Sequence, residues 1–442
     1  MTPRPARSRS PSRAERAGWA FRADDEAVFA ALASGRKAAS LREYFGTPAY
    51  AELSSLAAAA DRAKRAGGAR VLVLPGIMGS KLGCRAQPRG QGGQGGGGGR
   101  DLPDLLWMDP LRISDGLLPR LKLPAGDTAR AMGVLLISYA RLKLELEVAG
   151  CDVGLHAYDW RRGIDVLGAE LAARIEREGR PVMLVAHSMG GLVARVAAGL
   201  LPKRSIRRLI LLGTPNHGSF ASVQALRGTY STVRKIALLD RHHSARFLAE
   251  HVFGTFPGLY QLLPSRRLRG VDLFDARSWP AGPPRPRAEL LARAKSARAL
   301  LAPADSRMVH IIGVNQDTVV GIRRTPAGFE YTVRKSGDGT VPLALAALPN
   351  LCSYYVEEAH SNLANNREVI GAVIDLIRRG HTRRLPRRWR NKPGPVQRTD
   401  DAQLRRERGA KIDWRKLSSA EREAALADLD SARLACSVQP RR

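Results

Sequence analysis

The segment from residue 181 to residue 201 constrains the fold of this chain more than any other. It opens with the apolar run PVMLV (181–185), continues as AHSMGG (186–191), and ends in a helix-like stretch that stops before Pro202. A serine between a buried strand and a helix, with small residues two positions before and after it, is the G-x-S-x-G turn, here with alanine for the first glycine. Such a turn lifts the hydroxyl of Ser188 above a sheet, where the dipole of the following helix points.

Short apolar runs recur along the chain and alternate with helix-like stretches of about 10 to 15 residues. This alternation predicts an α/β-hydrolase fold, with a mostly parallel sheet covered by helices on both faces. Residues 219–305 interrupt the alternation, and their helical, bulky apolar character predicts an inserted cap or lid. The predicted strands lie at 71–74, 152–156, 182–185, 206–212, 308–314 and 353–356.

Composition divides the chain into three parts. Residues 1–66 start with about 18 Arg-, Ser- and Pro-rich positions, which we expect to be disordered, and continue as an Ala-rich helical extension. Residues 67–380 hold the hydrolase domain, in which the Gly-rich segment 87–100 should project from the surface as a flexible loop. Residues 381–442 form a basic tail, expected to be weakly structured apart from one helix near 418–434.

A nucleophilic serine needs an orienting acid and a base, which follow it in that order in this fold. Two aspartates follow predicted strands. Asp338 lies in SGDGTVP, where flanking glycines suit a tight turn that aims the carboxylate. Asp317 lies in NQDT and looks more like a residue that stabilises a local turn. The sequence therefore favours Asp338 as the acid.

The base is best assigned to His360 among the nine histidines. It follows the last predicted strand, precedes a helix and lies 22 residues after the predicted acid. His187 precedes the serine within the turn, and His217 comes too early in the chain. His242 and His243 lie in the predicted cap, in an Arg-rich context that favours a solvated surface.

Acyl transfer also needs two donors for an oxyanion. One should be the backbone N–H of Met189, which follows the serine. The other should come from PGIMGS (75–80), the loop after the first predicted strand, whose small residues allow close approach. Within that loop Ile77 is the first candidate and Gly76 the second.

Six motifs occur in one order over residues 69–380: PGIMGS, YDWR, AHSMGG, GTPNHGS, FPGLYQLLP and GDGTVP. In this combination the chain resembles the lecithin:cholesterol acyltransferase and phospholipid:diacylglycerol acyltransferase family of α/β hydrolases, which includes a lysosomal phospholipase. The resemblance implies that a fatty acyl group leaves a glycerolipid ester through an acyl-serine intermediate and passes to an alcohol or to water. It implies no metal and no cofactor.

Matching the motifs residue by residue gives the implied roles. Ser188 is the nucleophile, Asp338 the acid and His360 the base, while the amides of Ile77 and Met189 hold the oxyanion. The chain differs from relatives that act outside the cytosol, which carry a signal or anchor and a short lid loop closed by a disulfide. The Gly-rich segment stands in place of that lid loop.

Apolar residues gather in the predicted cap, and two interpretations of them stay open. They can line a groove for an acyl chain, or they can be the core of an ordinary helical subdomain. Under the first interpretation the candidate substrate-binding residues are Phe253, Phe256 and Tyr260, together with Trp160 before the cap. For Trp160 a place in the core is slightly favoured.

The chain is strongly basic, with 72 Lys and Arg against 41 Asp and Glu and a net charge of +31. The excess is spread along the chain with inflated Ala and Gly, which favours coding bias over attraction to an anionic surface. The tail is the exception, because residues 378–390 hold seven arginines and no acid. There, Arg383 to Arg390 with Trp389 could contact an anionic membrane.

Other classes of function are weighed against these observations. A nucleic-acid-binding protein with an inert hydrolase fold would explain the charge, but no known nucleic-acid module accompanies it, so no nucleic-acid partner is expected. A carboxylesterase or thioesterase acting on a short-chain or protein-linked acyl group would keep the same catalytic residues. Which lipid is used, and the oligomeric state, stay open.

The expected cellular location rests on two kinds of segment, a membrane span and a signal peptide, that the sequence does not show. No apolar run approaches the roughly 18 residues of a membrane span, and the N-terminus has no apolar core of a signal peptide. The four cysteines lie far apart, which fits a reducing compartment. We expect a cytoplasmic or peripheral membrane protein, with signal-independent export left open.

Overall fold

The computed structural model describes residues 18–63, 67–84, 104–124, 129–265, 271–392, 394–406, 409–418, 421–422 and 424–425. The predicted disordered start, the Gly-rich segment 87–100 and most of the predicted helix near 418–434 lie outside these residues. Among the described residues, no helix combines the length and the apolar character needed to cross a bilayer.

Six parallel strands form the central sheet, in the order β11-β8-β7-β6-β1-β5. Most of their side chains are buried, because helices cover both faces of the sheet. This arrangement confirms the predicted α/β-hydrolase fold. The strands are β1 (Arg70–Leu74), β5 (Asp152–Leu155), β6 (Val182–His187), β7 (Ile206–Leu212), β8 (Met308–Gly313) and β11 (Cys352–Val356).

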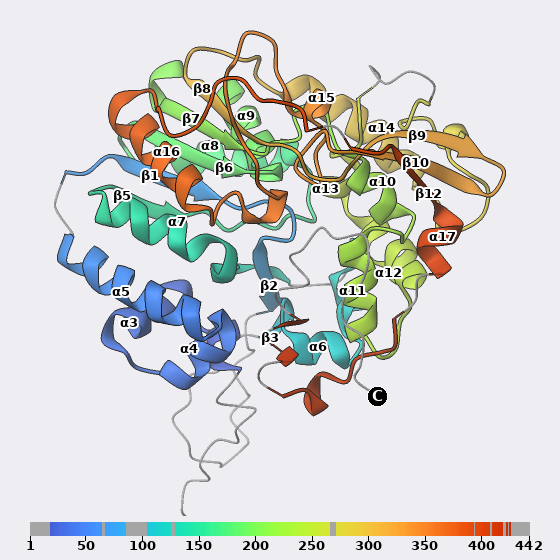
Figure 1. Ribbon diagram of the computed structural model, residues 1–442, viewed down its shortest axis with the longest axis horizontal. Coiled ribbons are helices and arrows are strands. Elements are labelled where there is room, and N and C mark those ends of the chain that lie inside the picture. The colour runs from blue at the N-terminus through green and yellow to red at the C-terminus, as the bar shows by residue number, and fades with distance from the viewer. Residues whose placement is uncertain are drawn as a thin grey trace, which may run out of the picture.

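Four helices pack against this sheet (Figure 1). α8 (Ile164–Arg177) packs closely against α9 (Met189–Leu200), while α7 (Leu136–Val148) and α16 (Arg367–Arg379) contact each other. α16 begins where the Asn366 side chain accepts a hydrogen bond from the Val369 amide. It ends at Gly380, whose φ of 81° is the left-handed conformation that glycine adopts most easily.

The strand order reverses at β1, and this reversal places the site. The chain passes from β1 to β5 on one side and then to β6 on the other. In sheets of this kind ligands bind beyond the carboxyl ends of the strands, at the point of reversal. The loop after β1 and the turn after β6 therefore meet at the binding edge.

Four helices form what we call the N-terminal layer, which lies next to α7 in Figure 1. They are α2 (Trp19–Arg22), α3 (Asp25–Ser34), α4 (Ala38–Phe45) and α5 (Thr47–Ala63). A small antiparallel sheet of order β3-β2-β4 lies beside the layer. Its strands are β2 (Ser80–Cys84), β3 (Asp104–Trp107) and β4 (Arg130–Val134). Between β3 and β4 the chain forms α6 (Pro110–Ser114) and the short 3-10 turn η1 (Leu118–Leu121).

The described part of residues 219–305 is helical. Its longer elements are α10 (Phe220–Leu226), α11 (Ser231–Leu239), α12 (Ala245–His251), α13 (Pro257–Tyr260) and α14 (Ala288–Ala297). Short 3-10 turns separate them at η3 (Phe253–Thr255), η4 (Ala276–Ser278) and η5 (Arg298–Leu300). We call this region the cap.

The basic tail is more ordered than its composition suggests. β12 (Gln397–Asp400) pairs with β10 (Gly328–Arg334), which pairs with β9 (Thr318–Thr325), in a second small sheet. α17 (Asp401–Arg406) follows β12, whereas η7 (Trp414–Lys416) contacts α6. The expectation of weak structure after residue 380 is wrong for these elements, because the open edge of β10 supplies partners for a polar strand.

Asp401 is the tail residue that holds this arrangement together. It is fully buried, and its carboxylate accepts hydrogen bonds from Arg227 Nε of the cap at 2.9 Å and from the Tyr331 hydroxyl at 2.7 Å. Burial, and then the nearby carboxylate, raise the pKa of Tyr331 well above its usual value, so the phenol stays a donor. The tail and the cap thus share one buried ion pair.

Candidate active site

Ser188 occupies the tight turn between β6 and α9, with φ of 53° and ψ of −124°. The turn leaves no space for larger neighbours. A Cβ atom on Gly190 would lie 2.5 Å from the carbonyl oxygen of Pro75, and one on Gly191 would lie 1.9 Å from Thr214 Oγ1. Both distances are too short for any residue except glycine. The glycines therefore let the strained serine turn pack against the loops after β1 and β7.

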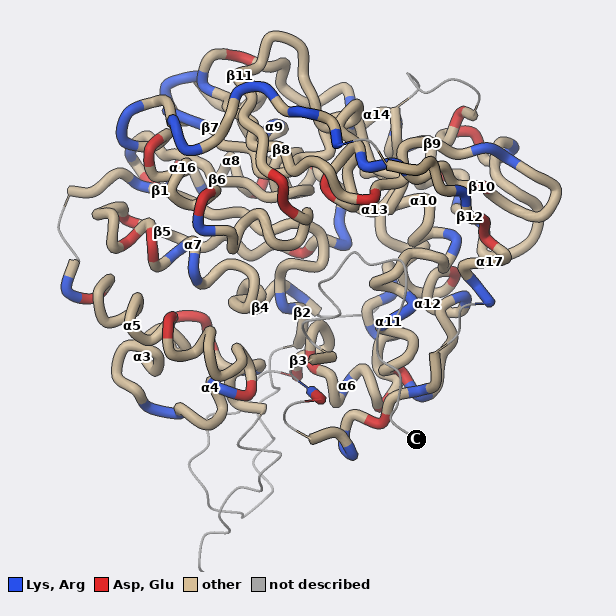
Figure 2. The backbone as a smooth tube through the Cα atoms, viewed as in Figure 1, with Lys and Arg blue, Asp and Glu red and all other residues tan. Residues whose placement is uncertain are grey.

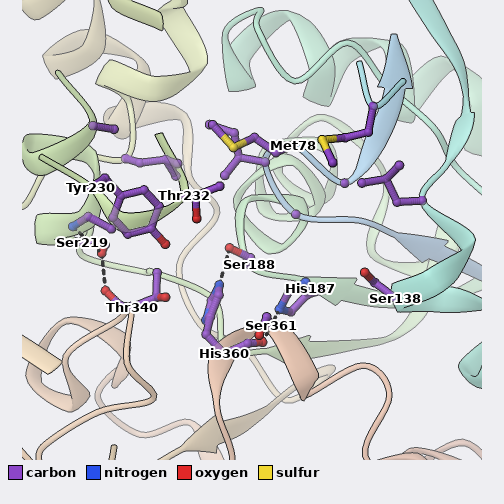
Figure 3. A pocket seen from close by; sticks show the side chains of 18 of the residues that line it. Met78, Ser138, His187, Ser188, Ser219, Tyr230, Thr232, Thr340, His360 and Ser361 are labelled. Carbon is purple, nitrogen blue, oxygen red and sulfur yellow. Dashed lines mark hydrogen bonds between the residues drawn. The ribbon is translucent and has the colours of Figure 1, made fainter. Parts of the chain in front are cut away.

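The structure brings the three predicted catalytic side chains together, and Figure 3 shows the hydrogen bond between Ser188 and His360. His360 Nε2 lies 2.8 Å from Ser188 Oγ, and His360 Nδ1 lies 2.7 Å from Asp338 Oδ2. The other Asp338 oxygen accepts the amides of Thr340 at 3.0 Å and Val341 at 2.7 Å. Since the carboxylate can only accept, His360 Nδ1 carries the proton and Nε2 is free to take one from the serine.

The alternative acid lies elsewhere. Asp317 is exposed, whereas Asp338 is 1% exposed and His360 is 8% exposed. The amide of His360 also donates to the carbonyl oxygen of Asp338 at 2.8 Å, which joins the two loops. The geometry therefore favours Asp338 over Asp317, as the glycine pattern around it suggests.

The oxyanion donors are placed by the turn after β6 and the loop after β1. Met189 begins α9, so its amide belongs to the unpaired first turn of a helix. Gly76 packs tightly under the nucleophile, since a Cβ there would lie 2.9 Å from Ser188 Cβ. Its own amide donates to the Tyr139 hydroxyl at 2.9 Å. Because that amide is engaged, Ile77 is the better second donor.

A chain of hydrogen bonds links this loop to the catalytic histidine, and sequence reasoning did not reveal it. The Tyr139 hydroxyl accepts from Gly76 and lies 2.8 Å from His187 Nδ1, while His187 Nε2 lies 3.0 Å from the carbonyl oxygen of His360. Burial, and then the neighbouring His360, lower the pKa of His187 to about 3. A neutral His187 accepts at Nδ1 and donates at Nε2, so each polar atom has one role.

Replacing Tyr139 with phenylalanine should lower kcat roughly fivefold and leave KM nearly unchanged, since one buried hydrogen bond is worth about 1 kcal/mol. Phenylalanine keeps the packing but cannot hold the Gly76 amide or donate to His187. Steady-state kinetics on a soluble ester, normalised by active-site titration, measure the effect. Tyr354→Phe is the matched control, because this buried tyrosine contacts the Thr382 amide instead. Equal rates in both variants would contradict a positioning role for Tyr139.

Ser188 opens into one large cavity, of about 1470 Å³ when the space open to solvent is counted. Most of its wall is apolar. In Figure 3, Ser219, Tyr230 and Thr340 lie on one side of Ser188, and Ser138 lies on the other. The first side belongs to the cap and its neighbouring loop, and the second belongs to α7.

The four residues predicted to bind substrate do not line this cavity. Trp160, Phe253, Phe256 and Tyr260 are each 0% exposed and pack into the interior. The Trp160 indole donates to the carbonyl oxygen of Ser80 at 3.0 Å, and its ring meets Phe256 edge to face at 5.6 Å. Aromatic edges and faces attract one another, which explains why these residues form a core. The interpretation as a packed subdomain is therefore the correct one for them.

Comparisons with known proteins gave one family match and several structural matches. The model of the PGAP1-like alpha/beta domain matches residues 167–254. The mature lipase BlEst2 of Bacillus licheniformis is 14% identical, with 71% of this chain and 94% of that chain covered and a TM-score of 0.35. A chain of the Tle4–Tli4 complex is 14% identical, with coverages of 71% and 98% and a TM-score of 0.46.

A third solved structure, phospholipase PlaB from Legionella pneumophila, is 13% identical, with coverages of 71% and 60% and a TM-score of 0.33. No curated protein matches the chain in sequence. The matched domain spans the serine turn itself, which lies at the reversal point of a parallel sheet. In fold, this chain is an α/β hydrolase.

Proposed function

We propose that this chain is a serine-dependent lipid acyl hydrolase or O-acyltransferase of the lecithin:cholesterol acyltransferase-like type. The observation that carries the proposal is the Ser188–His360–Asp338 hydrogen-bonded series opening into a large, mainly apolar cavity. A cavity with such walls suits a hydrocarbon chain. The six ordered motifs support a glycerolipid ester as the substrate.

The first half of the reaction forms an acyl-enzyme. Ser188 Oγ attacks the ester carbonyl carbon while His360 Nε2 takes its proton, and Asp338 stabilises the resulting imidazolium. The amides of Ile77 and Met189 stabilise the negative charge on the carbonyl oxygen. The bond from the carbonyl carbon to the leaving oxygen then breaks, and His360 returns the proton to that oxygen.

The second half repeats these steps with a new nucleophile. His360 removes a proton from water or from an acceptor alcohol, whose oxygen attacks the acyl carbon. Collapse of the intermediate breaks the bond to Ser188 Oγ, and His360 reprotonates the serine. Water gives a free fatty acid, and an alcohol gives a new ester.

Product analysis by mass spectrometry tests the proposal. Wild-type protein and the inactive Ser188→Ala variant are incubated with mixed phospholipid vesicles that contain a long-chain alcohol. Free fatty acid and lysophospholipid from the wild type alone would establish a phospholipase, and acylated alcohol in addition would establish an acyltransferase. If neither forms but a soluble short-chain ester is cleaved, the lipid assignment fails and the esterase or thioesterase alternative stands.

We also propose that the basic tail docks the enzyme on anionic phospholipid. Arg383, Arg387 and Arg388 are exposed, and Figure 2 marks the Lys and Arg positions along the backbone in blue. The tail passes the edge strand β11, where Pro386 accepts the Tyr355 amide, and reaches Asn315 just beyond β8. These positions lie near the carboxyl ends of the strands, the same edge as the catalytic loops.

Replacing Arg383, Arg387 and Arg388 with glutamine should weaken binding to phosphatidylserine-containing vesicles by roughly 100-fold at low salt, since each arginine near such a surface contributes about 1 kcal/mol. Hydrolysis of a soluble ester should not change. Vesicle sedimentation at two salt concentrations measures the effect. Truncation at residue 380 is unsuitable, because it would remove the buried Asp401.

The control for this prediction carries the same loss of charge at the amino ends of the strands, opposite the catalytic loops. Lys203, Arg204 and Arg207 are exposed and lie at the start of β7. Their triple glutamine variant should bind vesicles almost as well as the wild type. Equal weakening by both triples would mean that only net charge matters, and docking by the tail would then be rejected.

A further inference from the structure

Two aromatic residues of the N-terminal layer belong to the wall of the catalytic cavity. Phe21 of α2 and Tyr44 of α4 line the cavity together with Ile137 and Ser138, which lie in the first turn of α7. Their rings meet edge to face, with centroids 4.8 Å apart and planes at 89°. Phe21 is 9% exposed and Tyr44 is 4% exposed, so they form a packed part of the wall.

A buried ion pair fixes the N-terminal layer to the small sheet. Lys81 of β2 is only 3% exposed, and its Nζ atom lies 2.8 Å from Asp25 Oδ1 and donates to the carbonyl oxygen of Ala23 at 2.9 Å. The other Asp25 oxygen accepts the Val134 amide at 2.8 Å. A buried pair whose ammonium and carboxylate each also bond to the backbone holds its two elements in one relative position.

Further contacts place the two rings themselves. Arg22, next to Phe21, pairs with Asp109 at 2.9 Å. The amide of Ala20 donates to Ser40 Oγ at 3.2 Å, which ties α2 to α4. The rings are therefore held on both sides, and the layer forms a rigid part of the cavity wall.

The two sides of the cavity differ in chemistry. The cap side carries the hydroxyls of Ser219, Tyr230, Thr232 and Thr340 among apolar groups of Ile236, Leu259 and Leu262. The opposite side holds apolar groups of Met78, Leu135 and Ile137 and the hydroxyls of Ser138 and Tyr139, and the Tyr139 hydroxyl is already bonded to Gly76 and His187.

The phenol of Tyr44 in this wall carries no charge near neutral pH. Burial, and then the Asp25 carboxylate, raise the pKa of Tyr44 above its usual value, so the hydroxyl stays neutral. The apolar side thus suits a hydrocarbon chain, and the hydroxyl-bearing side suits the alcohol part of an ester.

We propose that the acyl chain of the substrate lies in the apolar side and that Phe21 and Tyr44 limit its length. The N-terminal layer is then part of the active site and determines acyl specificity. The inference rests on the proposed acyl-transfer function. It adds that the acyl part of the ester enters the apolar side of the cavity and the alcohol part enters the cap side. Neither ring touches the reacting atoms, so both act on specificity alone.

Two series of soluble esters test the inference. In the first the acyl chain lengthens from butanoyl to palmitoyl on a p-nitrophenyl group, and in the second the alcohol lengthens on a fixed acetyl group. In Tyr44→Ala and Phe21→Ala, the ratio of kcat/KM for palmitoyl over octanoyl esters should rise about tenfold, because removal of a ring makes room for several methylenes. The alcohol series should not change.

A filling variant and a control complete the design. Ser138 of α7 lines the same side, so Ser138→Met should lower the palmitoyl-to-octanoyl ratio about tenfold. This variant decides the question even if an alanine variant does not fold. Phe29→Ala is the control, because Phe29 is a buried ring of the same layer that does not line the cavity, and its ratio should equal that of the wild type.

The outcomes separate this inference from the proposed function. Unchanged ratios in active Tyr44→Ala, Phe21→Ala and Ser138→Met proteins would overturn it, and so would a shift seen in the alcohol series instead. Loss of all Ser188-dependent ester cleavage in the wild type would overturn the proposed function itself. Opposite shifts from emptying and filling variants would support the inference.

Discussion

Replacing Ser188 with alanine should lower kcat by about 10⁶, to the rate that the oxyanion donors and binding alone provide. Removal of the nucleophile in serine proteases has an effect of this size. The hydroxyl is 2.8 Å from its base and fixed by the turn, so no neighbouring group can replace it. Burst and steady-state kinetics on a soluble ester measure the loss.

Ser222→Ala is the matched control for this substitution. Ser222 lines the same cavity, and its hydroxyl donates to the carbonyl oxygen of Ser219 at 2.7 Å, away from the catalytic base. It should keep most of the activity. Equal activity of Ser188→Ala and wild-type protein, above a matched background, would reject the whole mechanism.

Asp338→Asn should lower kcat by about 10⁴, as the same change does in a serine protease. The reason lies in the surroundings of the carboxylate. Its Oδ1 atom accepts two amides, from Thr340 and Val341, so an asparagine would keep its carbonyl oxygen there and turn its NH₂ group toward His360. The imidazole would then carry its proton on Nε2 and could not accept one from the serine.

Asp317→Asn tests this assignment directly, because Asp317 is the other acid that the sequence offers. It is exposed, and its replacement should leave kcat within about twofold of the wild type, as expected for a surface change. Circular dichroism and thermal unfolding verify that both variants fold. A larger loss from Asp317→Asn than from Asp338→Asn would contradict the assignment of Asp338 as the acid of the triad.

The sequence predicts the central sheet and catalytic residues well because both depend on local signals. Ser188, Asp338 and His360 each follow a strand or precede a helix, and parallel strands bring such positions to one edge. The glycines of the serine turn, Gly190 and Gly191, are also visible in the local sequence. These elements need no knowledge of how distant segments dock.

Other parts depend on docking and could not be predicted. The polar strand β12 forms only because the edge of β10 is open to it. The contribution of Tyr44 to the cavity depends on the pairing of Asp25 with Lys81, which no local pattern reveals. The hairpin β9–β10 is different, since its alternating residues and the Pro326–Gly328 turn gave a signal that sequence analysis did not use.

Apolar composition alone also could not separate a core from a cavity wall. Phe253 and Phe256 have the residue types expected of an acyl site, yet they fill the interior of the cap. Phe21 lines the cavity although its surrounding sequence has no distinguishing feature. Burial is decided by which surfaces meet, and both kinds of surface are apolar.

The buried pairing of Asp401 with Arg227 has a consequence for how the molecule is made. The ribosome delivers the nucleophile, acid and base before it delivers Asp401, and chains begin to fold from the N-terminus during synthesis. Until that carboxylate arrives, the guanidinium of Arg227 has only the carbonyl oxygens of Gly282 and Pro284 as partners within the cap. A nascent chain therefore holds every catalytic group before the cap gains its ion pair with the tail.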